Sequence, residues 1–415
     1  MKKLELLAPA GDLEKLKIAV EYGADAVYFG GEMFSLRSGA GNLTIGEIRE
    51  GVKYAHERNV KCHMALNIFA HNEDIEPLKA YLEEIGDIPI DAFIVSDPGV
   101  LSVVREMMPG AEIHLSTQAN MTNYAAADFW YGRGVKRLVT ARELTLGEIS
   151  EIRSAIPEDM EIESFVHGAM CISYSGRCLL SNYMINRDAN RGQCAHPCRW
   201  KYSLVEEQRP GQYYPVEEDD SGTYIMNSKD LCMLKHIPEL INAGVSSAKI
   251  EGRMKSVFYV AIVVSAYRRA IDAYYDDPEN YVFDPKWMAE LEKASHREFT
   301  TGFYFDKPTD EDQNYRTSAY TREYSFIGMV KGYDDKTGMA LVEQRNKMVI
   351  GDEIEVFGPP GLMPSRDFFT QKLTVMKNED GEDIDAAPHP QQLLYIKMEQ
   401  PVGKNFILRK KKQDN

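Results

Sequence analysis

The feature that most constrains the fold is a regular alternation of two hydrophobic periodicities over the first 275 residues. Short apolar or β-branched runs, typical of strands, alternate with segments whose apolar residues recur at helical spacing. The runs that predict strands are 4–9, 26–30, 62–67, 92–97, 112–117, 136–141, 161–168 and 246–252. The segments that predict helices are 12–22, 44–58, 75–86, 99–107, 121–131, 145–155, 231–243 and 256–275.

Eight strand–helix units in a segment of this length predict a closed (β/α)₈ barrel of the TIM type over residues 1–275. The strands read as continuous apolar runs, as strands covered on both faces do. A doubly wound open sheet is the alternative, although it usually has fewer units. The segment APAGDLEK after the first strand lacks the glycine fingerprint of dinucleotide binding.

The spacing of the units breaks after the seventh strand, where residues 169–230 form a predicted insertion. This insertion leaves the C-terminal end of a barrel strand, which is where barrel enzymes build their active sites. Long insertions in such places are more often functional than decorative. Beyond the barrel we expect a connector at 276–323 with a short helix near 285–296. Alternating runs separated by turn sequences then predict a small antiparallel β-barrel at 324–412.

Charge and hydropathy narrow the class of protein. The N-terminus turns polar too soon for a secretory signal, and the longest apolar stretch, 257–266, is about half of a bilayer span. We therefore expect a cytoplasmic protein that does not bind membranes. The net charge of −16 argues against a uniformly basic nucleic-acid binder. The basic tail at 409–412 is either a local basic patch or a solvated terminus.

Cysteines cluster in the insertion. The chain has six, and four of them fall within 28 residues: Cys171, Cys178, Cys194 and Cys198. Because cytoplasmic thiols stay reduced, such a cluster indicates metal binding or catalysis rather than disulfides. An iron–sulfur cluster tolerates these loose spacings, whereas zinc sites usually show two close pairs. Both remain open, together with catalytic thiols. Cys232 is a fifth possible ligand, and Cys62 is predicted to be buried in the third strand.

Polar residues at the C-terminal ends of barrel strands point into the mouth of the barrel. The candidates for catalysis are Gln118, His167, Glu251 and Arg253. Lys249, Glu251 and Arg253 alternate, so that one face of the eighth strand carries all three. Arg253 could clamp a carboxylate or a phosphate, or the three could form an internal ion-pair network. A cysteine nucleophile would need a histidine base, for which His167 and His196 are near in sequence.

The segment ESFVHGAMCISYSGRCLLS, 163–181, resembles the signature of the collagenase-like peptidases, a family catalogued among peptidases of unknown catalytic type. The segments NRDANRGQCAHPCRWKY, YIMNSKDL and KIEGRMKS extend the likeness, as does the opening LLAPAGDLEKL. With the C-terminal β-module, the resemblance covers nearly the whole chain.

The resemblance implies more than the family's name. Some members modify RNA, and the sequence is most similar to a branch associated with 5-hydroxyuridine at the wobble position of tRNA. For this chain it implies a [4Fe–4S] cluster on Cys171, Cys178, Cys194 and Cys198, and prephenate as co-substrate. The expected partners are tRNA and this small carboxylate. The alternatives are zinc in place of the cluster and a metal- or thiol-dependent peptidase.

Aromatic residues of the insertion could stack an unpaired base, or could form a small core of the insertion itself. They are Tyr174, Tyr183, Trp200 and Tyr202.

Overall fold

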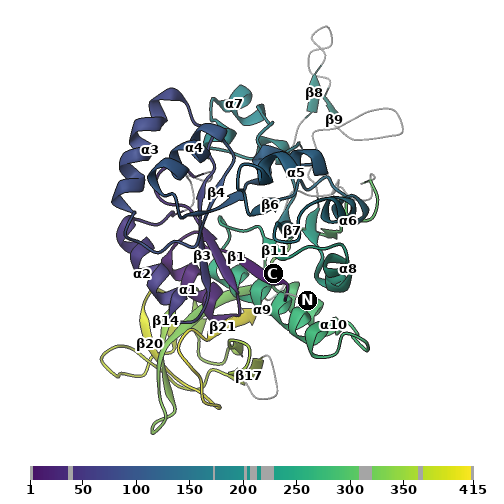
Figure 1. The fold of residues 1–415 in the computed structure, drawn as a ribbon. Helices are drawn as coiled ribbons and strands as arrows, with labels where there is room; N and C mark the ends of the chain where they lie inside the picture. The colour runs from purple at the N-terminus through teal and green to yellow at the C-terminus, as the bar shows by residue number, and fades with distance from the viewer. Residues whose placement is uncertain are drawn as a thin grey trace.

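The computed structural model describes residues 3–35, 41–171, 173–200, 203–205, 213–215, 229–307, 320–362 and 368–412. Within them the chain forms a closed parallel barrel surrounded by helices and a separate curled antiparallel sheet (Figure 1). The predicted TIM-type fold followed by an antiparallel module is confirmed. Tyr202 and the middle of the insertion lie outside the described residues.

Eight parallel strands form the barrel, and each lies close to a predicted apolar run. They are β1 (Glu5–Pro9), β2 (Ala26–Phe29), β3 (Lys61–Leu66), β4 (Ala92–Val95), β5 (Glu112–Leu115), β6 (Arg137–Val139), β7 (Glu161–Ala169) and β11 (Ser247–Ile250). Strand β11 pairs with both β7 and β1, which closes the barrel. Most residues of these strands are buried, because helices cover their outer faces and side chains fill the interior.

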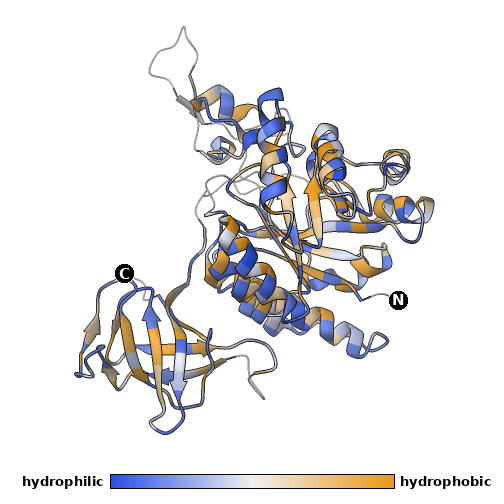
Figure 2. Cartoon of the chain, turned by 60° about the vertical axis from the view of Figure 1, so that its left-hand side comes forward, coloured by the Kyte–Doolittle hydropathy of each residue, from blue (hydrophilic) through white to orange (hydrophobic). Residues whose placement is uncertain are grey.

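The surrounding helices present polar residues to solvent and apolar residues to the strands (Figure 2). They are α1 (Leu13–Glu21), α2 (Ile45–His56), α3 (Asn72–Glu84), α4 (Pro98–Met107), α5 (Tyr124–Tyr131), α6 (Leu146–Ala155), α8 (Ile237–Asn242) and α9 (Val257–Asp276). Two predicted starts are confirmed by their caps. Thr44 forms a capping box with Glu47, and Ser256 accepts a hydrogen bond from the backbone of Tyr259 at 3.2 Å.

The helix predicted at 231–243 is wrong in its first half. Strand β10 (Asp230–Cys232) occupies that position and runs antiparallel to the end of β7, with Cys232 opposite His167. It also pairs in parallel with β12 (Phe299–Thr300), and a 3₁₀ turn, η4 (Leu234–His236), leads into α8. β7 is nine residues long, so its extended end offers free backbone groups to the chain as it returns from the insertion.

The described parts of the insertion and connector are short elements. They are α7 (Leu180–Ile185), η2 (Ala189–Arg191), η3 (Pro197–Arg199), the hairpin strands β8 (Ser203–Val205) and β9 (Tyr213–Pro215), and α10 (Pro285–Leu291). A further 3₁₀ turn, η1 (Thr117–Ala119), directly follows β5. In Figure 1, α7 and the hairpin lie above the barrel and the C-terminal sheet lies below it. No helix in the described part of the chain is both long and apolar enough to cross a bilayer.

The C-terminal sheet has the strand order β17-β16-β21-β13-β14-β20-β18. Its strands are β13 (Tyr324–Asp334), β14 (Met339–Gln344), β16 (Glu353–Phe357), β17 (Phe368–Lys372), β18 (Met376–Lys377), β20 (Leu393–Lys397) and β21 (Ile407–Lys411), beside a small pair, β15 (Met348–Val349) and β19 (Ala386–Ala387). The basic tail belongs to β21. Arg409 pairs with Glu355 at 2.7 Å and with Glu290, so the tail is part of the sheet rather than a solvated terminus.

A buried ion network fills the lower part of the barrel interior. Arg137 on β6 contacts Glu5 on β1 at 2.5 Å, and Glu161 and Glu163 on β7 at 2.5 and 3.1 Å. Lys249 on β11 contacts Glu163 at 2.7 Å. Burial would raise the pKa of Glu163, but Lys249 and Arg137 outweigh it and lower the pKa to about 2. These charges therefore stay ionised inside the barrel, held by one another.

Arg137→Met should strongly destabilise the barrel, because it leaves buried carboxylates without their counter-charge. Removing one partner from a buried ion pair costs about 3–5 kcal/mol. Urea unfolding followed by circular dichroism measures the change in free energy. The matched control is Lys136→Met, whose ion pair with Asp159 lies at the surface. Equal unfolding midpoints for the two variants would contradict this account of the network.

Candidate active site at the barrel mouth

A cavity of about 930 Å³ opens at the C-terminal ends of the barrel strands. Its walls come from the strand ends and the loops that follow them, the cysteine-rich insertion, the connector around Arg297 and Tyr320, and the C-terminal module at the start of β13 and at Lys412. Phe258, at the start of α9, stacks on Phe326 of β13 with ring centroids 5.8 Å apart. The C-terminal sheet, a separate lobe in Figure 2, is thereby fixed against the barrel and contributes to the site.

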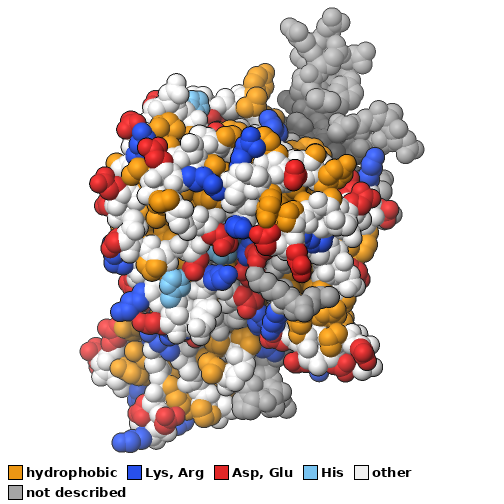
Figure 3. Space-filling view, in the orientation of Figure 1, with side chains coloured by type: hydrophobic (Ala, Val, Ile, Leu, Met, Phe, Trp, Pro, Cys, Tyr) orange, Lys and Arg blue, Asp and Glu red, His pale blue; other side chains and the backbone are white. Residues whose placement is uncertain are grey.

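The cavity is cationic although the chain as a whole carries a net charge of −16. Its described lining includes Arg142, Lys249, Arg253, Lys255, Arg297, Arg322 and Lys412. Glu251 is the one carboxylate among the described lining residues. On the face shown in Figure 3, by contrast, acidic and basic side chains are interspersed. This segregation of charge favours an anionic ligand in the cavity.

All four clustered cysteines line this cavity, and none of them forms a disulfide. Cys171 is exposed there, and Cys178, Cys194 and Cys198 are partly buried. Cys232 is not among the lining residues described, because it is buried in β10, and burial raises the pKa of its thiol to about 11. Cys62 is buried in β3, as predicted. The structure therefore separates the four cavity thiols from the other two.

Hydrogen-bond donors lie close to two of these sulfurs. Arg142 Nη1 lies 3.8 Å from Cys171 Sγ, and the backbone N–H of His196 donates to Cys194 Sγ at 3.4 Å. The Arg142 guanidinium also donates to the Ala169 carbonyl at 2.9 Å and lies over the Phe165 ring, which fixes its position. Such donors stabilise thiolates, the form in which cysteine binds metals.

The spacing of the sulfurs bears on the choice between zinc and a cluster. Zinc holds sulfur at about 2.3 Å, so the sulfurs of a tetrahedral site are roughly 3.8 Å apart. Among the described residues, no trio of potential ligands that includes a loop cysteine lies within 4.8 Å of one another. The described loop cysteines therefore do not form the compact ligand set that a preformed tetrahedral zinc site would show.

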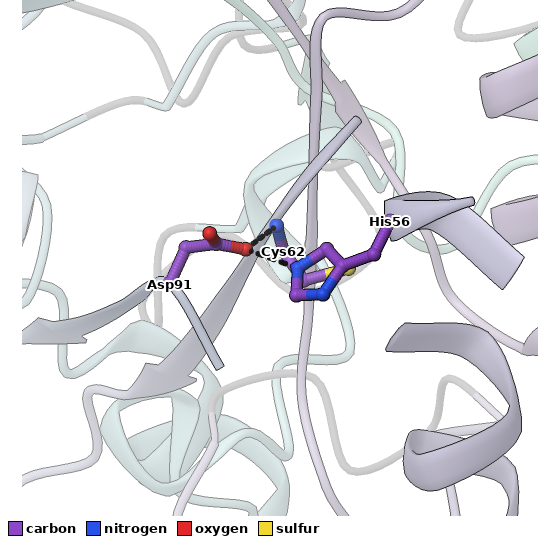
Figure 4. A group of neighbouring side chains, drawn as sticks. All are labelled: His56, Cys62 and Asp91. Atoms are coloured by element: carbon purple, nitrogen blue, oxygen red, sulfur yellow. Dashed lines mark hydrogen bonds and ion pairs between the residues drawn. The ribbon is translucent and has the colours of Figure 1, made fainter. Parts of the chain in front are cut away.

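One compact trio of potential ligands does occur, but outside this cavity. His56, Cys62 and Asp91 lie at the N-terminal end of β3, with their ligand atoms within 4.8 Å of one another (Figure 4). Asp91 Oδ2 accepts hydrogen bonds from the backbone of Cys62 at 2.7 Å and from His56 Nε2 at 2.8 Å. Burial raises the pKa of the Cys62 thiol. The group is a hydrogen-bonded brace between neighbouring elements.

Three of the four predicted catalytic residues line the cavity. Gln118 lies beside Asn67, whose amide nitrogen is 3.2 Å from Gln118 Oε1. Glu251 lies 3.6 Å from Arg142. Arg253 is buried and donates to Asn42 Oδ1 at 2.5 Å and to Ser35 Oγ at 3.2 Å. Lys249, Glu251 and Arg253, predicted to share one face of the eighth strand, all line the cavity. Lys249 forms its ion pair with Glu163 in the barrel interior rather than with Glu251.

His167 is not among the described residues that line the cavity. Its ring lies 5.6–5.9 Å from the rings of Tyr259 and Tyr267 on α9 and Phe299 on β12. Burial, with a smaller contribution from Lys255, lowers the pKa of His167 to about 3, so the imidazole is neutral at physiological pH. In this position it packs the barrel wall against α9.

Arg142 is the lining residue that sequence reasoning missed. It follows β6 in the segment KRLVTAR, and the rule that singled out Gln118 and Arg253 applies to it equally. Lys412 belongs to the basic tail that the sequence analysis gave as a possible basic patch. Lys255, Arg297 and Arg322 were not predicted, and the last two lie outside the predicted barrel.

Residues 11–314 match the family described as Peptidase family U32, and residues 322–409 match the C-terminal domain of the same family. The chain belongs to peptidase family U32. Among the U32 relatives, tRNA hydroxylation protein P1 of Bacillus subtilis is 46% identical over 99% of this chain and 96% of that protein. tRNA hydroxylation protein P of Escherichia coli is 38% identical over 98% and 96%. A collagenase of Porphyromonas gingivalis is 34% identical over 86% of each chain.

The buried His167 predicts a pH dependence of stability. The unfolded chain has a histidine pKa near 6.5, whereas the folded pKa is about 3, so unfolding takes up a proton between these values. Stability should therefore fall as the pH drops below about 6.5, by up to ~1.4 kcal/mol per pH unit from this residue. His167→Phe should flatten the dependence in urea unfolding measured at several pH values.

The control for this experiment is His389→Gln, since His389 is exposed in the C-terminal sheet region. If the wild-type chain and His167→Phe lose stability equally on acidification, His167 is not held neutral by burial.

Proposed function

We propose that this U32 protein is an RNA-modifying enzyme that forms 5-hydroxyuridine at the wobble position of tRNA. The observation that carries the proposal is that four cysteines and a set of cations line the same cavity at the mouth of the barrel. Relatives named as tRNA hydroxylation proteins, which match nearly the whole chain, support the choice of reaction and substrate.

An RNA substrate suits the charge and the aromatic character of this end of the molecule. The cations of the lining attract phosphates, and aromatic side chains can stack an unpaired base. Tyr174 lines the cavity with 45% of its surface exposed, and Tyr183 and Trp200 are 89% and 41% exposed on the same insertion. An exposed aromatic ring in a basic cavity, such as that of Tyr174, is typical of proteins that hold single-stranded nucleotides.

An iron–sulfur cluster is the cofactor that we propose. Cys171, Cys178, Cys194 and Cys198 would hold it, because all four thiols border the cavity and are free of disulfides. When bound, such a cluster supplies an electron carrier or a Lewis acid beside the substrate. Arg142 and the backbone N–H of His196 lie beside the sulfurs of Cys171 and Cys194 and would offset part of the negative charge of cluster-bound thiolates.

A small carboxylate co-substrate, with prephenate as our candidate, suits the deeper part of the cavity. Arg142, Lys249 and Arg253 are buried there, and a guanidinium binds a carboxylate with two parallel hydrogen bonds. Glu251, as the carboxylate of the described lining, is our candidate proton acceptor. The amide oxygen of Gln118 accepts hydrogen bonds from Asn67 and Ser116, and its amide N–H groups, which donate to none of the described residues, are our candidate donors to a substrate carbonyl.

The alternative is the peptidase that the family's name implies. A thiol peptidase built on Cys171 and His167 needs the imidazole to reach the thiol as a base. His167 instead packs against α9 and β12, and its pKa of about 3 makes it a poor base. This geometry disfavours a peptidase built on Cys171 and His167, whereas the other histidine named as a base, His196, lines the cavity with Nδ1 3.9 Å from Cys194 Sγ.

Individual cysteine variants should divide into two groups in a strain that lacks the endogenous activity. Cys171→Ser, Cys178→Ser, Cys194→Ser and Cys198→Ser should each abolish 5-hydroxyuridine derivatives in tRNA, because each removes a cofactor ligand. Cys62→Ala and Cys232→Ala should retain them, because these thiols lie away from the cavity. Mass spectrometry of tRNA nucleosides measures the outcome. Normal tRNA in the strain expressing the Cys171 variant would rule out the proposed role.

The cofactor has a separate test that does not depend on activity. After oxygen-free purification, the wild-type chain and the Cys232→Ala variant should contain iron and acid-labile sulfide, and the Cys178→Ser variant should lose both. Zinc without sulfide would reject the cluster. Cleavage of gelatin that depends on Cys171 alone, in protein without iron, would favour the peptidase.

A further inference from the structure

Three cations surround one aromatic ring at the outer part of the cavity. The Lys255 ammonium lies 3.9 Å from the centroid of the Tyr320 ring. The guanidinium carbons of Arg297 and Arg322 lie 4.8 and 6.0 Å from the same centroid, and Arg297 donates a hydrogen bond to the Tyr320 hydroxyl at 2.8 Å. All four residues line the cavity. We call this group the Tyr320 cluster.

A short β-bridge brings the members of the cluster together. His296 and Thr321 exchange backbone hydrogen bonds of 3.3 and 2.8 Å, which joins the segment before β12 to the segment that leads into β13. Tyr320 and Arg322 flank Thr321, so in extended backbone they project on the same side of it. Lys255 comes from the loop between β11 and α9, where its backbone N–H donates to the Gly252 carbonyl at 2.8 Å.

Two of the three cations of this cluster, Lys255 and Arg322, differ in their ion pairing from the cations of the barrel interior. Within the described parts of the chain, Lys255 and Arg322 take part in no ion pair, whereas Arg137 and Lys249 below them are paired. Asp230 accepts a hydrogen bond from the backbone of Arg297 at 3.2 Å. The Tyr320 ring offsets part of the repulsion between the cations, but it supplies no net charge.

The exposure of these cations is graded from the surface inwards. Arg322 and Lys412 are exposed, Lys255 is half-buried and Arg297 is buried. Lys412 lines the same cavity, and its backbone N–H donates to the Glu323 carbonyl at 2.7 Å. A small acid would be enclosed whole by the deeper cations. A strand that delivers one base to the cavity keeps its backbone at the rim, where these outer cations lie.

We propose that Lys255, Arg297 and Arg322 bind a phosphodiester group of the RNA strand whose base enters the cavity. This inference rests on the proposed function and adds to it the place where the RNA backbone is held. The barrel loop, the connector and the start of the C-terminal sheet then act as one phosphate site. Phosphate contacts of this kind position a strand without reading its sequence.

Filter binding of unmodified tRNA to the full-length chain, purified without oxygen, tests this inference. Lys255→Gln and Arg322→Gln should each weaken binding by roughly 5- to 50-fold. Measured between about 50 and 200 mM salt, the slope of log affinity against log salt should fall by about 0.7–0.9 for each phosphate that the variant no longer neutralises. The matched control is Lys53→Gln, which removes the same charge from the exposed side of α2.

The outcomes separate this inference from the proposed function. If the wild-type chain binds and hydroxylates tRNA but both variants match it in affinity and salt slope, the phosphate site is wrong and the function stands. If the variants lose affinity for prephenate while tRNA binding is unchanged, the cluster serves the small acid instead. If the wild-type chain binds no tRNA, both proposals fail. Iron content and urea midpoints equal to those of the wild type establish that the variants are folded.

Discussion

The ion network around Arg137 is the constraint on which the rest of the molecule depends. Its carboxylates come from β1 and β7, its second cation comes from β11, and these three strands are the ones that close the barrel. A buried charge without its partner is so costly that strand pairing in any other register is disfavoured. Lys249 belongs both to this network and to the lining of the cavity. The ion pairs that join the closing strands therefore also hold the floor of the cavity in place.

Much of the architecture could be predicted because it follows from local periodicity. The strands and helices of the barrel lie where the two hydrophobic periods alternate, and the caps at Thr44 and Ser256 depend only on neighbouring residues. Strand β10 could not be predicted in this way. A segment of three residues such as Asp230–Cys232 is compatible with a helix or a strand, and the choice is made by pairing with the distant end of β7.

In the candidate site, too, the features that depend on neighbouring residues could be predicted, and those that depend on distant contacts could not. The four cavity cysteines are close in sequence, and their spacing alone indicated a shared site. His167 was expected in the mouth because it ends a strand, but the register of β7 against β11 shifts between Lys249 and Ile250. Beyond this irregularity the simple alternation of inward and outward side chains is broken, and His167 turns towards α9. The Tyr320 cluster needs contacts between segments far apart in the chain, which no local pattern records.

Charge segregation explains how an acidic protein can accept a polyanion. The chain carries a net charge of −16, whereas the described lining of the cavity holds seven cations and one carboxylate, so a polyanion would be attracted there. At physiological salt the field of exposed charges decays over about 8 Å, so the cations act on a strand that is already close. Affinity then depends on contact geometry rather than on long-range steering. Such an arrangement favours a substrate whose unpaired base enters the cavity while the adjacent phosphate contacts the outer cations. Duplex RNA presents phosphates but no free base, and is therefore disfavoured.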